Sequence, residues 1–203
     1  MEKEKRTLKF SEIFGFGAGG MFTYGFQLMI TGYYLLYYMT DIAGFSTVLA
    51  ASLYSTIQII KMVTMLFSGV IIDAINFRSG KYRTWVLVSG IGLGLFFPLS
   101  FFYYPLPQSV YVVVFMIIYT LQTLFYNVGW TAMRAVIGKV AKNKADVVAL
   151  NTSAQSAGTI SSILYGYIGY PILGIALWAG TKQAYGCASA IYGLTIILGA
   201  IYM

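Results

Sequence analysis

Few residues in this sequence could do chemistry, and several reactive types are missing. The chain has no histidine and one cysteine, Cys187. Without histidine, it lacks the commonest metal ligand and the commonest proton carrier near neutral pH. One cysteine cannot form a disulfide within the chain. The apolar runs hold neither paired carboxylates nor a nucleophile beside a base, so we expect no enzyme activity, metal or cofactor.

One ionisable side chain lies deep within an apolar run. Lys61 is fifteen residues from Ser46 and seventeen from Arg78, near the middle of that run. An ammonium at the centre of a membrane costs at least ~2.5 kcal/mol, so it should face a cavity or an acceptor. A lysine that snorkels, or one satisfied by helix carbonyls, is the alternative. We expect Lys61 and Gln58 to supply charge and hydrogen bonding in a solute cavity.

Other polar side chains recur at helical spacing in the first, second, fourth and fifth of six apolar runs, while the third and sixth are nearly bare. The four runs that carry polar side chains should line a polar pathway, and the third and sixth runs should face lipid. Asn127 is expected to bind a solute hydroxyl, and three aromatic residues to stack on a sugar face. The serines and threonines could instead mediate helix packing. The predicted solute contacts are Tyr24, Gln27, Gln58, Lys61, Tyr126, Asn127 and Trp130.

Six membrane spans must position these side chains. Of 203 residues, 59% are apolar and 9% are charged, with a mean hydropathy of +0.75. No soluble domain of this size could bury so much apolar surface, whereas ~20 mainly apolar residues span a bilayer. Because the runs are apolar on every face, an amphipathic surface helix is excluded. The predicted spans cover about 13–39, 47–75, 85–104, 110–133, 147–173 and 185–203.

The basic residues indicate how the chain crosses the membrane. Eleven of thirteen lysines and arginines lie in the N-terminal segment and in two predicted loops, 76–84 and 134–146. The loops on the other side hold only Lys182. This bias places both termini in the cytoplasm, and it explains the net charge of +7 without a nucleic-acid partner. No cleavable signal peptide is evident.

The loop after the second span carries a specific motif. It reads Gly69-Val-Ile-Ile-Asp73-Ala-Ile-Asn-Phe-Arg78-Ser-Gly80-Lys81-Tyr-Arg83. This stretch resembles the signature between the second and third helices of the major facilitator superfamily. Asp73 could pair with the basic side chains and latch one conformation, while the glycines allow close approach and a tight turn. A generic basic loop would explain the cations but not the spaced Gly and Asp.

Within that superfamily the chain is most similar to the glycoside-pentoside-hexuronide:cation symporter family. The similar stretches are 15–19, 33–44, 80–85 and 127–133. The resemblance implies an all-α, six-helix half-bundle of two inverted three-helix repeats over residues 1–203, the N-terminal half of a twelve-span fold. It also implies carriage of a small polar solute, such as a sugar or glycoside, across the inner membrane by alternating access. A second half would be another copy, a separate chain or a C-terminal part.

The departures from the family pattern bear on ion coupling. The family keeps cation-binding acidic residues in the second helix, where this chain reads Gln58-Ile-Ile-Lys61. Gly129 stands where proline is usual, and Ala154 where a basic residue is expected. The sequence therefore predicts transport without sodium coupling. A six-span channel, or a non-transporting helical scaffold acting as an oligomer, remains the alternative.

Overall fold

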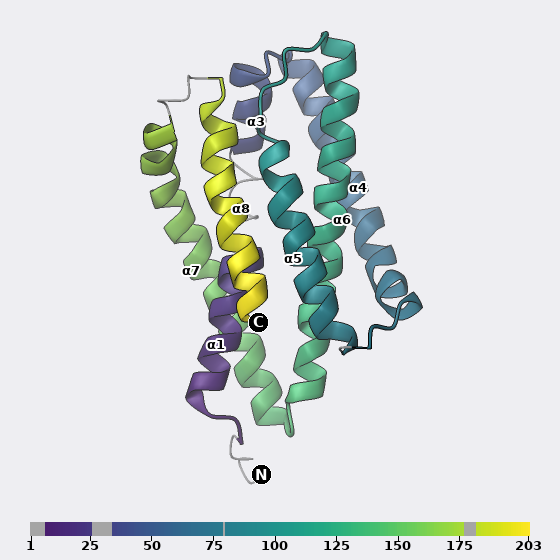
Figure 1. Ribbon diagram of the computed structural model, residues 1–203, viewed down its shortest axis with the longest axis vertical. Coiled ribbons are helices and arrows are strands. Elements are labelled where there is room, and N and C mark those ends of the chain that lie inside the picture. Colours follow the sequence, from purple (N-terminus) through teal and green to yellow (C-terminus); the bar gives the residue numbers. More distant parts are fainter. Residues whose placement is uncertain (1–6, 26–33, 79, 177–181) are drawn as a thin grey trace.

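The computed structural model describes residues 7–25, 34–78, 80–176 and 182–203. These residues form a helical bundle (Figure 1) and contain no strand, which confirms the all-α prediction. The elements are α1 (Phe10–Gly20), η1 (Met21–Gly25), α3 (Leu35–Tyr37), η3 (Tyr38–Ile42), α4 (Thr47–Ala74), α5 (Lys81–Leu99), α6 (Gln108–Val140), α7 (Lys144–Ala176) and α8 (Ala184–Tyr202), where η1 and η3 are π-helical turns.

Helix α4 closely follows the predicted second span, and its start has a local cause. The Ser46 hydroxyl accepts a hydrogen bond from the Leu49 amide at 3.3 Å, which caps the first turn. Helix α5 begins directly after Gly80, which has a φ of 103°, a left-handed conformation that favours glycine. It ends at Leu99, earlier than the predicted 104, one residue after Pro98.

The two basic loops are shorter than the sequence predicted. Helix α6 continues to Val140, so residues 134–140 of the predicted loop 134–146 are helical, and only 141–143 connect α6 to α7. The extension buries Ile137 in a small cluster with Ile13 and Leu150. Likewise, residues 81–84 of the predicted loop 76–84 belong to α5. Burial of Ile137 below the predicted span explains why hydropathy alone placed the end of α6 too early.

The first predicted span differs from the others in its backbone. In the described residues it consists of α1, the π-helical turn η1, the short α3 and the π-helical turn η3. Such π-helical turns are frequent at functional sites. Glycine lets α1 approach its neighbours closely, because a Cβ at Gly17 would lie 2.2 Å from the Ser153 hydroxyl of α7.

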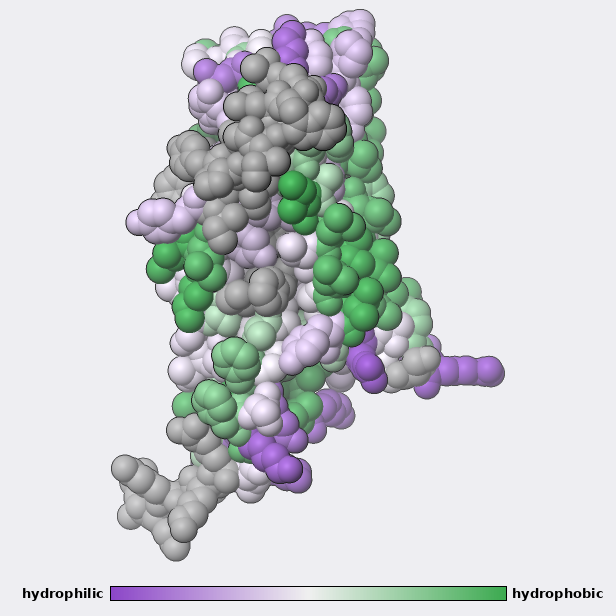
Figure 2. Space-filling view, turned by 60° about the vertical axis from the view of Figure 1, so that its left-hand side comes forward, coloured by the Kyte–Doolittle hydropathy of each residue, from purple (hydrophilic) through white to green (hydrophobic). Residues whose placement is uncertain are grey.

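Four helices in the described ranges, α4, α5, α6 and α8, are long and apolar enough to cross a membrane. In Figure 2 the most hydrophilic residues gather at the two ends of the visible face, with hydrophobic residues between them. A multi-span membrane protein is therefore confirmed. The count of six spans in two inverted repeats stays a prediction, since residues 26–33 lie outside the described ranges.

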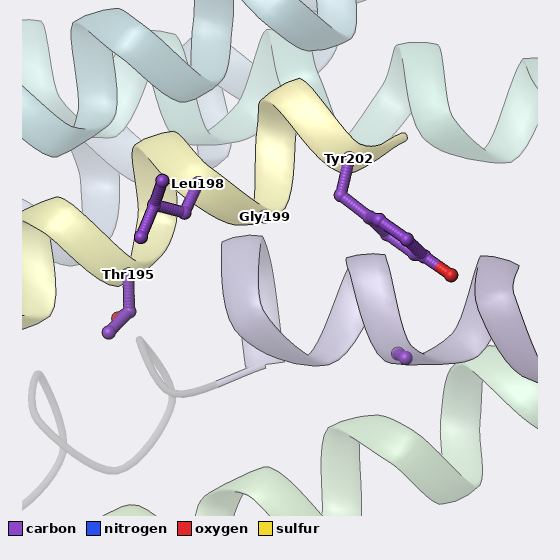
Figure 3. A pocket seen from close by; sticks show the side chains of 5 residues that line it. Thr195, Leu198, Gly199 and Tyr202 are labelled. Carbon is purple, nitrogen blue, oxygen red and sulfur yellow. The ribbon is translucent and has the colours of Figure 1, made fainter.

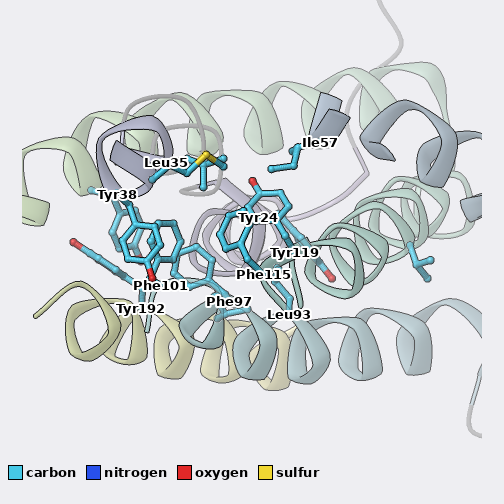
Figure 4. Packing of buried hydrophobic residues seen from close by; sticks show 14 of the residues in the cluster. Tyr24, Leu35, Tyr38, Ile57, Leu93, Phe97, Phe101, Phe115, Tyr119 and Tyr192 are labelled. Carbon is cyan, nitrogen blue, oxygen red and sulfur yellow. The ribbon is translucent and has the colours of Figure 1, made fainter. Parts of the chain in front are cut away.

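Helices α5 and α8 are packed closely, whereas α4 and α7 have fewer neighbours and form the open side of the bundle. Helix α5 packs along both α6 and α8, α4 packs mainly on α6, and α1 packs on α7 (Figure 1). Aromatic rings fill the interior between them, Tyr24, Phe97, Phe115 and Tyr119 among them (Figure 4). The start of α1, the α4–α5 loop and the α6–α7 loop lie at one end of the bundle (Figure 1), so the basic side chains described there share that end.

Candidate solute site

The predicted site residues of α4 and α6 come together at a polar contact between the two helices. The Asn127 side-chain amide donates to the Lys61 carbonyl at 3.0 Å and to the Thr64 hydroxyl at 2.7 Å. Further along the helices, the hydroxyls of Ser68 and Thr131 lie 2.8 Å apart. Asn127 is only 7% exposed. Through its hydrogen bond to the Lys61 carbonyl, the Asn127 amide helps to fix the backbone that carries Lys61.

The Lys61 side chain is partly exposed and reaches the rim of the aromatic core. Its Nζ lies 6.0 Å from the centre of the Tyr119 ring, the outer limit for a cation–π contact. Gln58 lies one turn earlier on α4 and is exposed. Lys61 and Gln58 therefore present an ammonium and an amide on neighbouring turns of α4, and their contact with a solute stays a prediction.

Three predicted aromatic residues form a second part of the site. Tyr24, on the turn η1, meets the rings of Tyr126 and Trp130 edge-on at 6.0 and 6.2 Å between centroids. The Tyr126 and Trp130 rings are nearly parallel and 6.4 Å apart. Tyr24 is only 1% exposed, and its hydroxyl donates to the Val86 carbonyl. Tyr24 thus packs in the interior in this conformation, while Tyr126 and Trp130 keep partly exposed ring surface.

Gly129 explains how the turn η1 can approach α6 so closely. A Cβ at this position would lie 2.1 Å from the Tyr24 hydroxyl oxygen, a separation that atoms do not tolerate. The glycine that stands where the family usually has proline therefore makes room for Tyr24. Gln27, the remaining predicted contact of the first span, lies outside the described residues.

The electrostatics of the site are set by cations. The Arg134 guanidinium lies 4.8 Å from the centre of the Trp130 ring, so Trp130 lies between a cation and Tyr126. In the described residues the carboxylates of Glu12, Asp41, Asp73 and Asp146 all belong to the ends of helices. The middle of the described bundle therefore contains Lys61 without an acidic side chain beside it.

The predicted latch is partly formed. Asp73, at the end of α4, accepts a hydrogen bond from Lys81 Nζ at 2.7 Å, and Gly80 provides the turn that brings Lys81 back. The other predicted latch cations, Arg78 and Arg83, do not join this ion pair. No atom of the described residues lies within 4 Å of a Cβ added at Gly69, so the close approach expected there stays a prediction.

A second polar tie at the same end of the bundle was not predicted. The buried Asp146 carboxylate, in the first turn of α7, accepts hydrogen bonds from the Thr7 amide at 2.9 Å, the Thr7 hydroxyl at 2.5 Å and the Leu8 amide at 3.3 Å. The Thr7 hydroxyl is the main cause that lowers the pKa of Asp146. The carboxylate thereby fastens the chain before α1 to the start of α7.

Sequence reasoning also missed Tyr119, Thr64 and Arg134. Tyr119, Thr123 and Asn127 follow one another at intervals of four residues, which places them along the α4 side of α6. Arg134 follows Trp130 by four residues, the spacing at which a cation can cover a ring on a helix. The sequence contains both spacings, but it does not show which helix packs against these residues.

The described residues also form an open groove of about 340 Å³ between α1 and α8, lined by Ala18, Thr195, Leu198, Gly199 and Tyr202 (Figure 3). Its lining is almost entirely apolar. None of the predicted solute contacts lies in it. A polar solute would find few hydrogen-bond partners there, so the groove is not the solute site.

Comparison with known proteins identifies the family of the chain. The chain matches a family model described as "MFS/sugar transport protein" over residues 15–203. It is 26% identical to the provisionally named glycoside/cation symporter YagG of Escherichia coli (strain K12), over 89% of this chain and 39% of that protein. It is 22% identical to the isoprimeverose transporter of Lactiplantibacillus pentosus, over 98% of this chain and 41% of that protein.

The chain thus spans about two fifths of the length of these two relatives. A shorter match, 24% identical over 64% of this chain and 29% of the relative, is to the inner membrane symporter YicJ of Escherichia coli (strain K12). The family match covers all of the described helices except the first turns of α1. It agrees with the prediction of a transport protein rather than an enzyme, and the chain belongs to the MFS/sugar transport protein family.

Proposed function

We propose that this chain is part of a secondary transporter that moves a small, sugar-like solute across the inner membrane by alternating access. The family match and the names of the relatives, two symporters and an isoprimeverose transporter, support this proposal. So does a polar contact between two helices apolar enough to span the membrane, with a lysine in the middle of one of them. Buried polar groups in spans usually belong to a transport pathway.

Each predicted contact has a role in this proposal. Tyr126 and Trp130 offer partly exposed ring faces for the apolar side of a sugar, and Gln58 offers a free-standing amide. Asn127 has its amide nitrogen bound to α4, so its carbonyl oxygen is the group left for a solute hydroxyl. Tyr24 and Gln27 would contribute in a conformation in which η1 has moved.

Transport is proposed to be independent of sodium. The position of the Lys61 ammonium in the middle of α4 is the observation that supports sodium independence. A sodium site needs oxygen ligands, and a fixed ammonium in the same place would repel the ion by about 4 kcal/mol at ~4 Å and an effective dielectric of ~20. No carboxylate of the described helices offsets that charge in mid-span. Lys61 would therefore act as a tethered cation in place of a bound one.

A second helical bundle is proposed to cover the open side of α4 and α7. Both helices expose polar side chains within the predicted spans, including Gln58 on α4 and Gln155 on α7. In a membrane such side chains should face protein or water rather than lipid. The relatives are long enough to contain a second half, and both halves would share a midplane site.

The proposed orientation has both termini in the cytoplasm. The basic segments described by the structure lie at one end of the bundle (Figure 1), as the positive-inside rule requires of cytoplasmic loops. The ion pair of Asp73 with Lys81 would then be a cytoplasmic latch that stabilises one conformation of the transporter.

The test is solute uptake by the protein in its functional assembly, in potassium-only and in sodium-containing buffer, with Lys61→Asp and Lys61→Ala as variants. We expect the unmodified protein to transport equally in both buffers. Sodium stimulation that appears only in Lys61→Asp would support the proposal strongly. Sodium stimulation of the unmodified protein would refute sodium independence, and the absence of any sugar uptake would refute the transporter itself.

A further inference from the structure

The Lys61 ammonium has no counter-charge within its own chain. Asp73 is the acidic residue nearest to it along α4, at a separation of about 18 Å, and it is already paired with Lys81. The six acidic residues of the sequence all lie at or beyond the ends of the predicted spans: Glu2, Glu4, Glu12, Asp41, Asp73 and Asp146. No carboxylate of this chain can therefore neutralise a lysine in mid-span.

The ammonium is also too deep to reach water at the membrane surface. Helix α4 extends about 20 Å to either side of Lys61, and the hydrocarbon core of a bilayer is ~30 Å thick. The four-carbon stem of a lysine covers only about one helical turn. Among the described residues the Tyr119 ring is its neighbour, with a centre 6.0 Å from Nζ, and at that distance a ring attracts a cation only weakly.

The exposed surface of α4 has an apolar stripe and a polar stripe. Ile59 and Leu66 are 63% and 70% exposed, and their spacing of seven residues places them on one side of the helix, which suits lipid. Tyr54, Gln58 and Lys61 follow one another at spacings of four and three, so they share a different side. Because polar side chains in a span should face protein or water, this second stripe is the side of α4 that needs a partner.

A second copy of this chain does not fit that requirement. Each copy has the same six acidic residues near the membrane surfaces and the same lysine in mid-span. An assembly of two copies would therefore add a second buried ammonium without adding a carboxylate at that depth. Buried charges without a partner are strongly destabilising, so the charge distribution disfavours a homodimer as the complete transporter.

We propose that the Lys61 stripe of α4 docks on a bundle of different sequence, and that a helix of this bundle carries a carboxylate at mid-membrane depth that pairs with Lys61. This inference rests on the proposed function, namely that a second bundle covers the open side of α4 and α7. It adds that the second bundle is not a copy of this chain. It also assigns to Lys61 an ion pair that holds the two bundles together, because a charge-assisted hydrogen bond satisfies both buried groups.

Cross-linking of the unmodified protein identifies the group that Lys61 touches. Membranes that contain the functional assembly are treated with dicyclohexylcarbodiimide, a membrane-permeant reagent that joins a contacting amine and carboxyl group as an amide, with loss of water. Peptide mass spectrometry should show the peptide of Lys61 joined to an acidic peptide from outside residues 1–203. The pair of Lys81 with Asp73 is the internal control, since its atoms are 2.7 Å apart and should cross-link in the same sample.

Variants then measure what the pair contributes to the assembly. Lys61→Gln should lower its unfolding temperature by about 5 °C or more, because the partner carboxylate stays buried without its cation. Lys61→Arg should retain the stability, and Lys61→Gln combined with the amide in place of the cross-linked carboxylate should restore most of it. Thr56→Val is the control, since Thr56 is exposed on α4 but donates to the Ser52 carbonyl of its own helix at 2.9 Å.

The outcomes separate this inference from the proposed function. If Lys81 cross-links to Asp73 but Lys61 forms no amide, then lipid, water or solute faces Lys61 and the inference is overturned, while solute uptake leaves the transporter intact. An amide of Lys61 with an acid of residues 1–203, or an active assembly made only of copies of this chain, would also overturn it. A cross-linked pair in an assembly that takes up no sugar would support the ion pair and refute the proposed function.

Discussion

The contact of α5 with α8 and the contact of α4 with α6 solve the same packing problem in different ways. Between α5 and α8, backbones touch at glycine, since a Cβ at Gly94 would lie 2.7 Å from the Gly193 carbonyl oxygen and one at Gly193 would lie 2.5 Å from that of Gly94. Between α4 and α6, side chains bridge the gap through Asn127 and through Ser68 with Thr131.

This difference separates a scaffold from a site. Two helices whose backbones touch at glycine pack in one fixed position and leave no room for a ligand between them, as expected of a fixed helix pair in a membrane. A contact made by a few hydrogen-bonding side chains leaves polar groups near the surface of the helices and can rearrange at modest cost. The candidate solute site lies on the second kind of contact, and the apolar half of the bundle supports it.

The largest effect should follow from filling the glycine contact. We expect Gly94→Val to destabilise the protein by about 3 kcal/mol, because the added atoms would overlap the backbone of α8. Thermal unfolding in detergent measures this. Gly138→Ala is the control, since nothing lies within 4 Å of a Cβ there and no loss is expected. Equal effects of the two variants would show that α5 and α8 are not in backbone contact.

A smaller effect is expected from removing the polar contact of α4 with α6. Asn127→Ala should cost about 1–2 kcal/mol, because two hydrogen bonds between helices are lost in a buried position. The same unfolding measurement applies. Asn151→Ala is the matched control, because the Asn151 amide donates only to the Val147 carbonyl of its own helix. If both asparagine variants lose the same free energy of unfolding, the hydrogen bonds between α4 and α6 stabilise the protein no more than one within a single helix.

The smallest effect should come from the polar tie of Asp146, because it fastens only the short chain before α1 to the start of α7. The pKa of Asp146 is lowered in the folded protein, chiefly by the hydroxyl of Thr7. Its stabilising contribution is therefore complete above the ordinary aspartate pKa of about 3.9, and it is lost as the pH falls through the lowered folded value. Asp146→Asn should lower the unfolding temperature at neutral pH, and the difference from the unmodified protein should shrink in acid.

The control for this pH series is Asp41→Asn. Asp41 is exposed and accepts a hydrogen bond from the adjacent Thr40, so Asp41→Asn breaks no tie between distant segments and should leave the unfolding temperature at neutral pH unchanged. A difference between Asp146→Asn and the unmodified protein that stays constant down to strongly acidic pH would contradict the role of the carboxylate charge. In that case the contact of Asp146 with Thr7 would stabilise the protein as an uncharged hydrogen bond does.

Much of the fold was predictable because a bilayer imposes a simple rule on sequence. Long apolar runs between basic loops predicted α4 and α8 to within a residue or two, and the spacing of Asp73 from the loop cations predicted an ion pair. The end of α6 was not predictable in the same way. Hydropathy marks where lipid ends, whereas Ile137 shows that the helix continues for as long as it can bury a side chain against its neighbours.

The sequence by itself determined that this chain is a helical membrane protein with a lysine and no carboxylate in mid-span, because composition and position along a run are local properties. Only the tertiary structure decided which partners meet. Asn127 bonds a helix more than sixty residues away, Thr7 bonds Asp146 across most of the chain, and Tyr24 reaches Trp130 only because Gly129 has no side chain. Such contacts depend on how helices pack together, and no spacing along one helix specifies that.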